Sequence, residues 1–184
     1  MSRSHHLQAT TKKPSIYEWS FLIFCTCFFL SETAISGTPI KHDPQGFLGI
    51  PWGDSLANRE DLKEIESSDS THIYTLKQEH PRVEGIQMES VKLYALENKY
   101  ARALFHYQGA TTHQSLLKFL ETRFGKIERS YGGMMRGLNQ QYTWRGPETE
   151  ISITYHGFRE RGLLIAESRI LAPLLLDLYE EQSN

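Results

Sequence analysis

Six histidines follow residue 36, and their spacing is the first test for metal or acid–base chemistry: His42, His72, His80, His106, His113 and His156. Metal ligands on one strand stand two residues apart, and ligands on one helix stand three or four apart. No two of these histidines have that spacing. His106 and His156 both fall late in predicted hairpin strands, opposite the predicted core residues. We interpret both as solvent-facing histidines, with a metal or proton-transfer site as the alternative.

The sequence lacks the short motifs that mark common catalytic sites. It contains no Gly-x-Ser-x-Gly nucleophile elbow, no Gly-x4-Gly-Lys-Ser/Thr phosphate loop and no His-Glu-x-x-His zinc helix. Hydrolysis by paired carboxylates stays open, because distant acids can meet in a fold, but no pair is indicated. We therefore predict no catalytic residue, no metal and no cofactor.

Two segments are candidates for ligand binding. One is the outward face of a predicted hairpin, which carries Tyr94, Arg102 and His106. We add His156, which occupies a comparable position in a later predicted hairpin. The other is the segment 131–137, where three glycines make the backbone pliable and two methionines, Met134 and Met135, offer soft apolar surface. The alternative for this segment, which the pattern favours, is a long hairpin connection whose methionines pack onto the core.

The hairpin that must position the first candidate surface is predicted from alternation. Residues 91–96 and 101–107 flank the turn residues Glu97, Asn98 and Lys99. Period-two alternation assigns seven residues to the core face: Val91, Leu93, Ala95, Ala101, Ala103, Phe105 and Tyr107. The opposite face then carries Lys92, Tyr94, Arg102, Leu104 and His106.

Helices are predicted on both sides of this hairpin. The first starts at Asp54 or Ser55, either of which can cap it, and runs to about residue 62. The second starts at a capping box over residues 111–114, in which Thr111 and Gln114 satisfy backbone amides reciprocally. It ends at Gly125, and its apolar face is formed by Leu116, Leu117, Leu120 and Phe124.

The order helix, strand, strand, hairpin occurs twice, over residues 54–109 and 111–170. Residues 63–68 and 125–130 match each other, as do 74–77 and 142–145. Strands outnumber helices, so the predicted fold class is α+β, with antiparallel sheets and packed helices. The repetition indicates either coincidence or two helix-plus-four-strand repeats about a pseudo-twofold, whose seam would form a groove.

The N-terminal 36 residues have the pattern of a cleaved secretory signal peptide. An apolar run of ten residues, 21–30, follows a positive leader and precedes the small-x-small site at residues 34–36. A membrane-spanning helix needs about 20 apolar residues, so an uncleaved anchor is the weaker alternative. Cys25 and Cys27, the two cysteines of the chain, both lie in this run.

Removal of the signal peptide would leave a single domain with a mildly acidic surface. We predict a flexible lead-in over residues 37–45 and one α+β domain over 46–184, ending in a helix over 171–181. Residues 37–184 contain 17 Lys and Arg against 20 Asp and Glu, without a basic stripe. Nucleic-acid binders carry a basic excess, so we predict no nucleic-acid partner, and no integral membrane span after cleavage.

Three segments, 47–56, the hairpin around Asn98 and 120–126, resemble small secreted or periplasmic α+β proteins of Gram-negative bacteria, which are largely uncharacterised. The resemblance implies a cell-envelope setting in the periplasm or outside the cell and carries over no catalytic residue. The hypothesis is a non-enzymatic binding or accessory module with an envelope protein or peptide partner. The alternative is a small envelope hydrolase that uses His106 or His156 as general base.

Overall fold

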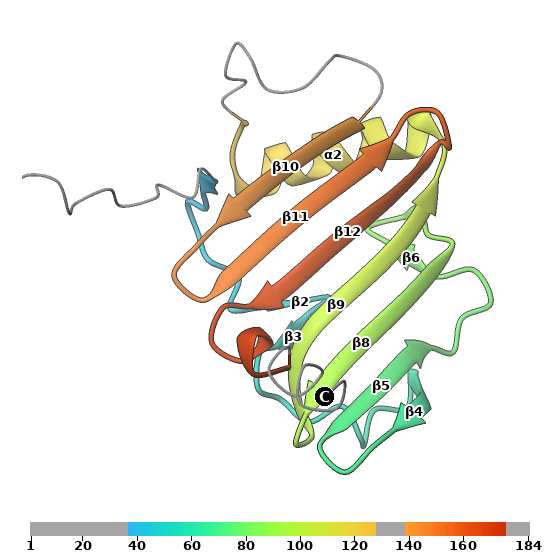
Figure 1. Cartoon of the computed structure of the whole chain (residues 1–184), viewed down its shortest axis with the longest axis vertical. Helices are drawn as coiled ribbons and strands as arrows, with labels where there is room; N and C mark the ends of the chain where they lie inside the picture. The colour runs from blue at the N-terminus through green and yellow to red at the C-terminus, as the bar shows by residue number, and fades with distance from the viewer. Residues whose placement is uncertain (1–36, 128–138, 176–184) are drawn as a thin grey trace, which may run out of the picture. The chain divides into compact units, whose positions relative to one another are not determined.

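The computed structural model describes residues 37–127 and 139–175. These residues form an eight-stranded sheet with the order β1-β10-β11-β12-β9-β8-β5-β4 (Figure 1). Its strands are β1 (Thr38–Pro39), β4 (Leu62–Ser67), β5 (Thr71–Leu76), β8 (Ser90–Leu96), β9 (Lys99–Gln108), β10 (Asn139–Arg145), β11 (Thr149–His156) and β12 (Arg161–Ser168). β1 is parallel to β10, and the other neighbours are antiparallel.

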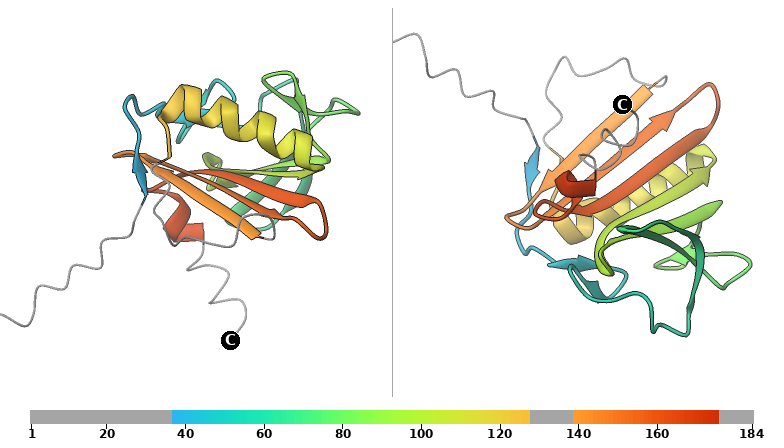
Figure 2. Two further views of the ribbon diagram at one scale, coloured as in Figure 1. Left: turned by 90° about the horizontal axis from the view of Figure 1, so that it is seen from above. Right: turned by 60° about the horizontal axis from the view of Figure 1, so that its bottom comes forward.

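Two short hairpins and one long helix complete the described fold. The hairpins are β2 (Gly46–Phe47) with β3 (Ile50–Pro51), and β6 (Arg82–Val83) with β7 (Ile86–Gln87). The helix α2 (Ala110–Phe124) lies across one face of the sheet (Figure 2, left). A short helical turn at residues 172–175 lies against the opposite face.

The predicted core face of the β8–β9 hairpin is confirmed for six of its seven residues, and the prediction for Ala101 is wrong. All seven residues assigned to it are at most 1% exposed: Val91, Leu93, Ala95, Ala101, Ala103, Phe105 and Tyr107. A β-bulge between Tyr94 and Ala95 shifts the pairing, so that Ala101 joins a separate cluster with Leu96 and Leu175 on the second face. The hairpin is thus covered by apolar side chains on both faces at its turn end.

Helix α2 covers the core much as its apolar periodicity predicts. Leu116, Leu120 and Phe124 are buried, and the helix ends at Gly125, whose φ is +118°. Its start differs from the prediction, because the N-cap is Gly109 and no side chain caps the helix. The predicted capping box is therefore wrong: Thr111 lies inside the first turn, where its carbonyl accepts a hydrogen bond from Ser115 Oγ at 3.0 Å.

The predicted α+β class with packed helices is wrong. Strands hold 49% of the described residues and helices 15%, so the fold is mostly β. No helix starts at Asp54 or Ser55. Instead, Gly53 N donates to Tyr100 O and Tyr100 N donates to Asp54 O, both at 2.8 Å, and Ser55 forms a bridge with Lys99. Pairing with β9 therefore prevails over the local capping signal.

The predicted pair of pseudo-twofold repeats is also wrong. The two halves of the sequence join in a continuous sheet, because β9 pairs with β12 from Gln108–Arg161 to Arg102–Glu167. Helix α2 packs against this shared sheet, and the described residues contain no second long helix to match it. The first predicted unit has no helix, because residues 54–62 are not helical, so the described residues do not form two helix-plus-four-strand repeats.

Asp43 lies in the segment predicted as a flexible lead-in and ties it to the β10–β11 turn. Its Oδ1 accepts from Thr149 Oγ1 at 2.5 Å, and its Oδ2 accepts from the amides of Glu148 and Thr149 at 2.7 and 3.1 Å. Burial acts to raise the pKa of Asp43, but these hydrogen bonds hold it below its ordinary value. The same segment includes β1 and the buried Ile40.

Candidate ligand-binding groove

The candidate site is an open groove of about 260 Å³ between the β2–β3 hairpin, the β6–β7 turn and the second half of α2. Its walls are predominantly apolar, formed by Phe47, Leu48, Ile50, Val83, Phe119 and Phe124. Phe47, Ile50, Val83 and Phe124 belong to the main core, whereas Leu48 and Phe119 are half-buried. Core side chains are therefore accessible in the groove. Predominantly apolar walls of this kind are typical of ligand-binding sites.

Both hairpin turns that line the groove hold a bulky residue in a left-handed backbone conformation. Leu48 has a φ of +57° and is followed by Gly49, and Glu84 has a φ of +49° and is followed by Gly85. Two-residue turns of this kind favour Asn, Asp or Gly at their first position. Glu97, Asn98 and Glu160, in turns away from the groove, have the same left-handed backbone, so this conformation fixes the two turns without marking the groove by itself.

One ion pair lies at the rim of the groove. Arg123 Nη1 lies 3.7 Å from Glu84 Oε1, and the two side chains are 56% and 58% exposed. Arg123 also places its guanidinium carbon 5.9 Å from the centre of the Phe124 ring, a cation–π contact. Helix α2 thus presents an aromatic wall with a cation beside it.

Two of the predicted ligand-binding residues, Tyr94 and Arg102, lie on the sheet face opposite α2. Tyr94 packs against the cluster that includes Leu175, in the helical turn 172–175. Arg102 Nε donates to Glu167 Oε2 at 2.7 Å, and its side chain is 17% exposed. Both residues therefore already have partners within the fold. Met134 and Met135 lie outside the described residues.

The two predicted histidines lie at the far end of the same sheet. His106 and His156 are both exposed. His156 Nδ1 lies 2.9 Å from Asn139 Oδ1. The cross-strand partners of His106 are Ser90 and Leu163, and those of His156 are Asn139 and Arg161. β12 therefore separates the two histidines.

A histidine that the sequence did not single out lies at the centre of a buried polar network. His113, in the first turn of α2, is 3% exposed. Its Nδ1 lies 2.7 Å from Tyr107 Oη, its Nε2 lies 3.1 Å from Gln140 Oε1, and its ring stacks on Tyr155 at 4.4 Å. Burial lowers the pKa of His113, although the hydrogen bond with Gln140 opposes this shift.

The Tyr107 hydroxyl links His113 to the backbone of β11. It carries one proton, which it can donate to Thr154 O at 3.1 Å or to His113 Nδ1 at 2.7 Å. Burial raises the pKa of the Tyr107 hydroxyl, so that it stays protonated as a donor. Because His113, Tyr107 and Tyr155 are buried, we interpret the network as structural support for the start of α2.

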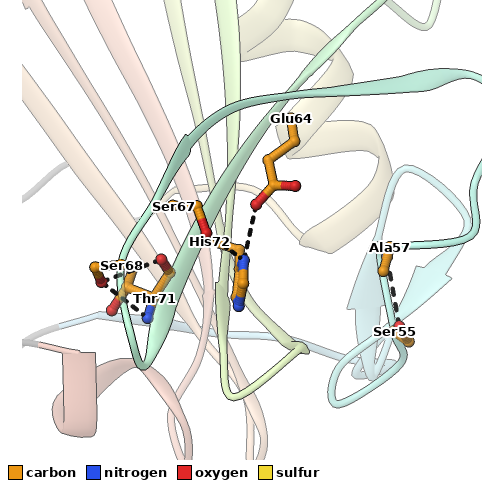
Figure 3. A network of polar contacts seen from close by, with 7 residues as sticks. All are labelled: Ser55, Ala57, Glu64, Ser67, Ser68, Thr71 and His72. Atoms are coloured by element: carbon orange, nitrogen blue, oxygen red, sulfur yellow. Dashed lines mark hydrogen bonds and ion pairs between the residues drawn. The ribbon is translucent and has the colours of Figure 1, made fainter.

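The β4–β5 hairpin holds a second histidine cluster, which resembles a hydrolase triad in composition but not in geometry (Figure 3). His72 Nδ1 lies 2.8 Å from Glu64 Oε1 and 3.1 Å from Ser67 Oγ. A catalytic triad places its acid and its nucleophile on opposite ring nitrogens. Here both contact Nδ1, so Glu64 cannot orient His72 as a base for Ser67.

The Ser68 hydroxyl closes the turn of the same hairpin. Ser68 Oγ donates to Thr71 O and accepts from Thr71 N, both at 3.2 Å.

The Glu64–His72 contact also affects the charge of Glu64, because the hydrogen bond with His72 lowers the pKa of the Glu64 carboxyl. We interpret these side-chain contacts as structural, because they join β4 to β5 at the edge of the sheet.

Within residues 37–127 and 139–175, no three His, Cys, Asp or Glu side chains are grouped so that they could hold a metal ion. In the same ranges, no helix is both long and apolar enough to cross a bilayer. Comparisons of the chain with family models, with curated proteins and with solved structures found no match. A proposal for the function of this chain therefore rests on the geometry of the described residues.

Proposed function

We propose that this chain is a secreted or periplasmic, non-enzymatic binding module, and that the groove beside α2 takes an apolar side chain of an envelope protein or peptide. The observation that carries the proposal is the open apolar groove flanked by two turns with left-handed Leu48 and Glu84. Such turns fix the position of the groove walls, and a preformed site loses less conformational entropy when a ligand binds.

The size of the groove favours a side chain over a cofactor. An apolar protein cavity of about 150 Å³ accepts benzene, so 260 Å³ accepts a group of roughly ten carbon atoms. Drug-sized ligands and cofactors occupy pockets of roughly 300–1,000 Å³. A Phe, Leu or Met side chain of a longer partner fits the groove, with the rest of the partner outside.

The hydrolase alternative receives no support from the described geometry. His106 and His156 lie on different strands, with β12 between them, and His156 contacts the neutral Asn139 rather than an acid. The Glu64–His72–Ser67 cluster has both partners on one ring nitrogen. Binding without turnover is therefore the function that we propose.

A nuclear magnetic resonance titration tests the groove. The probe is acetyl-phenylalanine amide, which carries an apolar side chain and no charge. We expect shifts at Leu48, Glu84 and Phe119 in the wild type, and weaker binding in Phe119→Ala because the groove loses an aromatic wall. Leu117→Ala is the matched control, since Leu117 lies on α2 but not in the groove. Shifts confined to other surfaces, or equal losses in both variants, would refute the proposal.

The envelope setting has a separate test, because it depends on the signal peptide predicted over residues 1–36. Mass spectrometry of the protein isolated from the envelope fraction should find Gly37, or a residue next to it, at the N-terminus. A chain that retains its first 36 residues would refute cleavage and favour an uncleaved anchor.

A further inference from the structure

The charged rim of the groove indicates which part of a partner is recognised. Phe119 and Arg123 stand four residues apart on α2, so they lie on the same face of the helix. Both line the groove. A ligand that places an apolar side chain against Phe119 therefore brings its adjoining backbone close to the Arg123 guanidinium.

The present partner of Arg123 holds it only loosely. The 3.7 Å separation from Glu84 exceeds hydrogen-bond length, and both side chains are more than half exposed. Exposed pairs of this kind contribute little to stability. A guanidinium can instead form two short parallel hydrogen bonds with a carboxylate. Arg123 can therefore exchange Glu84 for a ligand carboxylate, while its contact with Phe124 keeps it beside the groove.

We propose that the groove binds the C-terminal residue of a peptide, with the apolar side chain in the groove and the α-carboxylate on Arg123. This inference rests on the groove binding proposed above and specifies its partner. In a C-terminal residue the side chain and the carboxylate are bonded to the same Cα atom. A side chain in the groove therefore places the carboxylate near the rim, where Arg123 lies. A fatty acid fits less well, because its chain exceeds the roughly ten carbon atoms that the volume allows.

The rim charges predict opposite effects of two substitutions. Arg123→Gln removes the cation and should weaken binding of a peptide acid. Glu84→Gln removes the anion that competes for Arg123 and should strengthen it. Two other surface residues provide matched controls. Lys118 is exposed on α2 outside the groove lining, and Glu97 has the same left-handed backbone, with a φ of +47°, in the β8–β9 turn. Lys118→Gln and Glu97→Gln should leave binding unchanged.

The experiment compares acetyl-Gly-Ser-Phe as the free acid with the same peptide as its amide. Dissociation constants are measured by nuclear magnetic resonance titration of the full chain. We expect the acid to bind about tenfold more tightly than the amide in the wild type, since a charged hydrogen bond replaces a neutral one. The preference should disappear in Arg123→Gln and increase in Glu84→Gln. Melting curves of each variant confirm that it is folded.

Each remaining outcome has a definite meaning. Equal binding of acid and amide at the groove would overturn the carboxylate assignment and leave the proposed groove function standing. A preference for the acid that survives in Arg123→Gln would overturn the role of Arg123. Absence of binding by both peptides and by acetyl-phenylalanine amide would overturn the groove function itself.

Discussion

The ring of Tyr107 lies directly over Gly162, its cross-strand partner between β9 and β12. A Cβ atom at position 162 would lie only 2.0 Å from Tyr107 Cζ. Because glycine leaves the sheet surface open, the ring can cross β12. Its hydroxyl then reaches Thr154 O on β11 at 3.1 Å and His113 Nδ1 on α2 at 2.7 Å. One glycine thus allows two strands and the helix to share a buried hydrogen-bond network.

Gly162→Ala should therefore destabilise the protein. The added methyl group forces the Tyr107 ring out of its place, and overpacking of this kind costs about 1–3 kcal/mol in the free energy of unfolding. Urea melts give the value. In a Tyr107→Ala background the same substitution should cost much less, because the clashing ring is gone. Equal costs in the two backgrounds would contradict the assigned contact.

His113 should make stability depend on pH. Burial lowers its pKa below the ordinary value of 6.5, although the Gln140 hydrogen bond opposes this. The unfolded chain therefore takes up the proton at higher pH than the folded protein. The His113 contribution to the free energy of unfolding should be fully present above pH 6.5 and decrease as pH falls below it.

Urea melts over a pH series, compared between wild type and His113→Gln, measure this contribution. The variant should have a flatter pH dependence below pH 6.5, whereas His106→Gln, at an exposed strand position, should retain the wild-type slope. Identical slopes in wild type and His113→Gln would show that protonation of His113 does not limit stability.

Tyr100→Phe should leave stability unchanged or raise it by about 1 kcal/mol. Tyr100 is completely buried, and its hydroxyl has no hydrogen-bond partner among the described residues. Removal of the oxygen therefore removes an unsatisfied group. Tyr107→Phe is the matched comparison, because it breaks two hydrogen bonds and should cost about 1–3 kcal/mol. A loss at Tyr100 as large as that at Tyr107 would refute the assignment.

Adjacent residues on β9 should respond very differently to truncation. Phe105 is completely buried and contacts the Phe47 ring at 5.5 Å, so Phe105→Ala should cost about 3–5 kcal/mol. His106 points to the other face and is exposed, so His106→Ala should change the free energy of unfolding by less than about 0.5 kcal/mol. Thermal or urea melts of both variants check the pair. A large loss at His106 would mean that a further segment covers this end of the sheet.

The elements that the sequence predicts correctly are those whose signals are local. The β8–β9 hairpin follows from alternation and a turn, and α2 from the period of Leu116, Leu120 and Phe124. The predicted first helix fails because the residues after Gly53 pair with Tyr100, far along the chain. The predicted helix-plus-four-strand repeats fail with it, because the first unit then has no helix. The pairing with Tyr100 leaves no mark in the local pattern.

The candidate site was hidden for the same reason. Its walls come from three separate segments, and each reads as an ordinary turn or helix face. The local signals were a bulky or charged residue before glycine, as in Leu48-Gly49 and Glu84-Gly85, between apolar neighbours. His113 was hidden as well, because its burial depends on Tyr155 and Gln140 from distant strands.

The strand order also bears on when the sheet can form during synthesis. β12 lies between the β8–β9 hairpin and the β10–β11 pair and joins them into one sheet. It is also the last strand of the described chain. Pairings between distant segments slow folding, because loop closure must precede the contacts that stabilise it. A growing chain therefore lacks its central sheet until residues 161–168 are available. Such delayed folding would suit the export that we propose, since secretion channels thread chains before they fold.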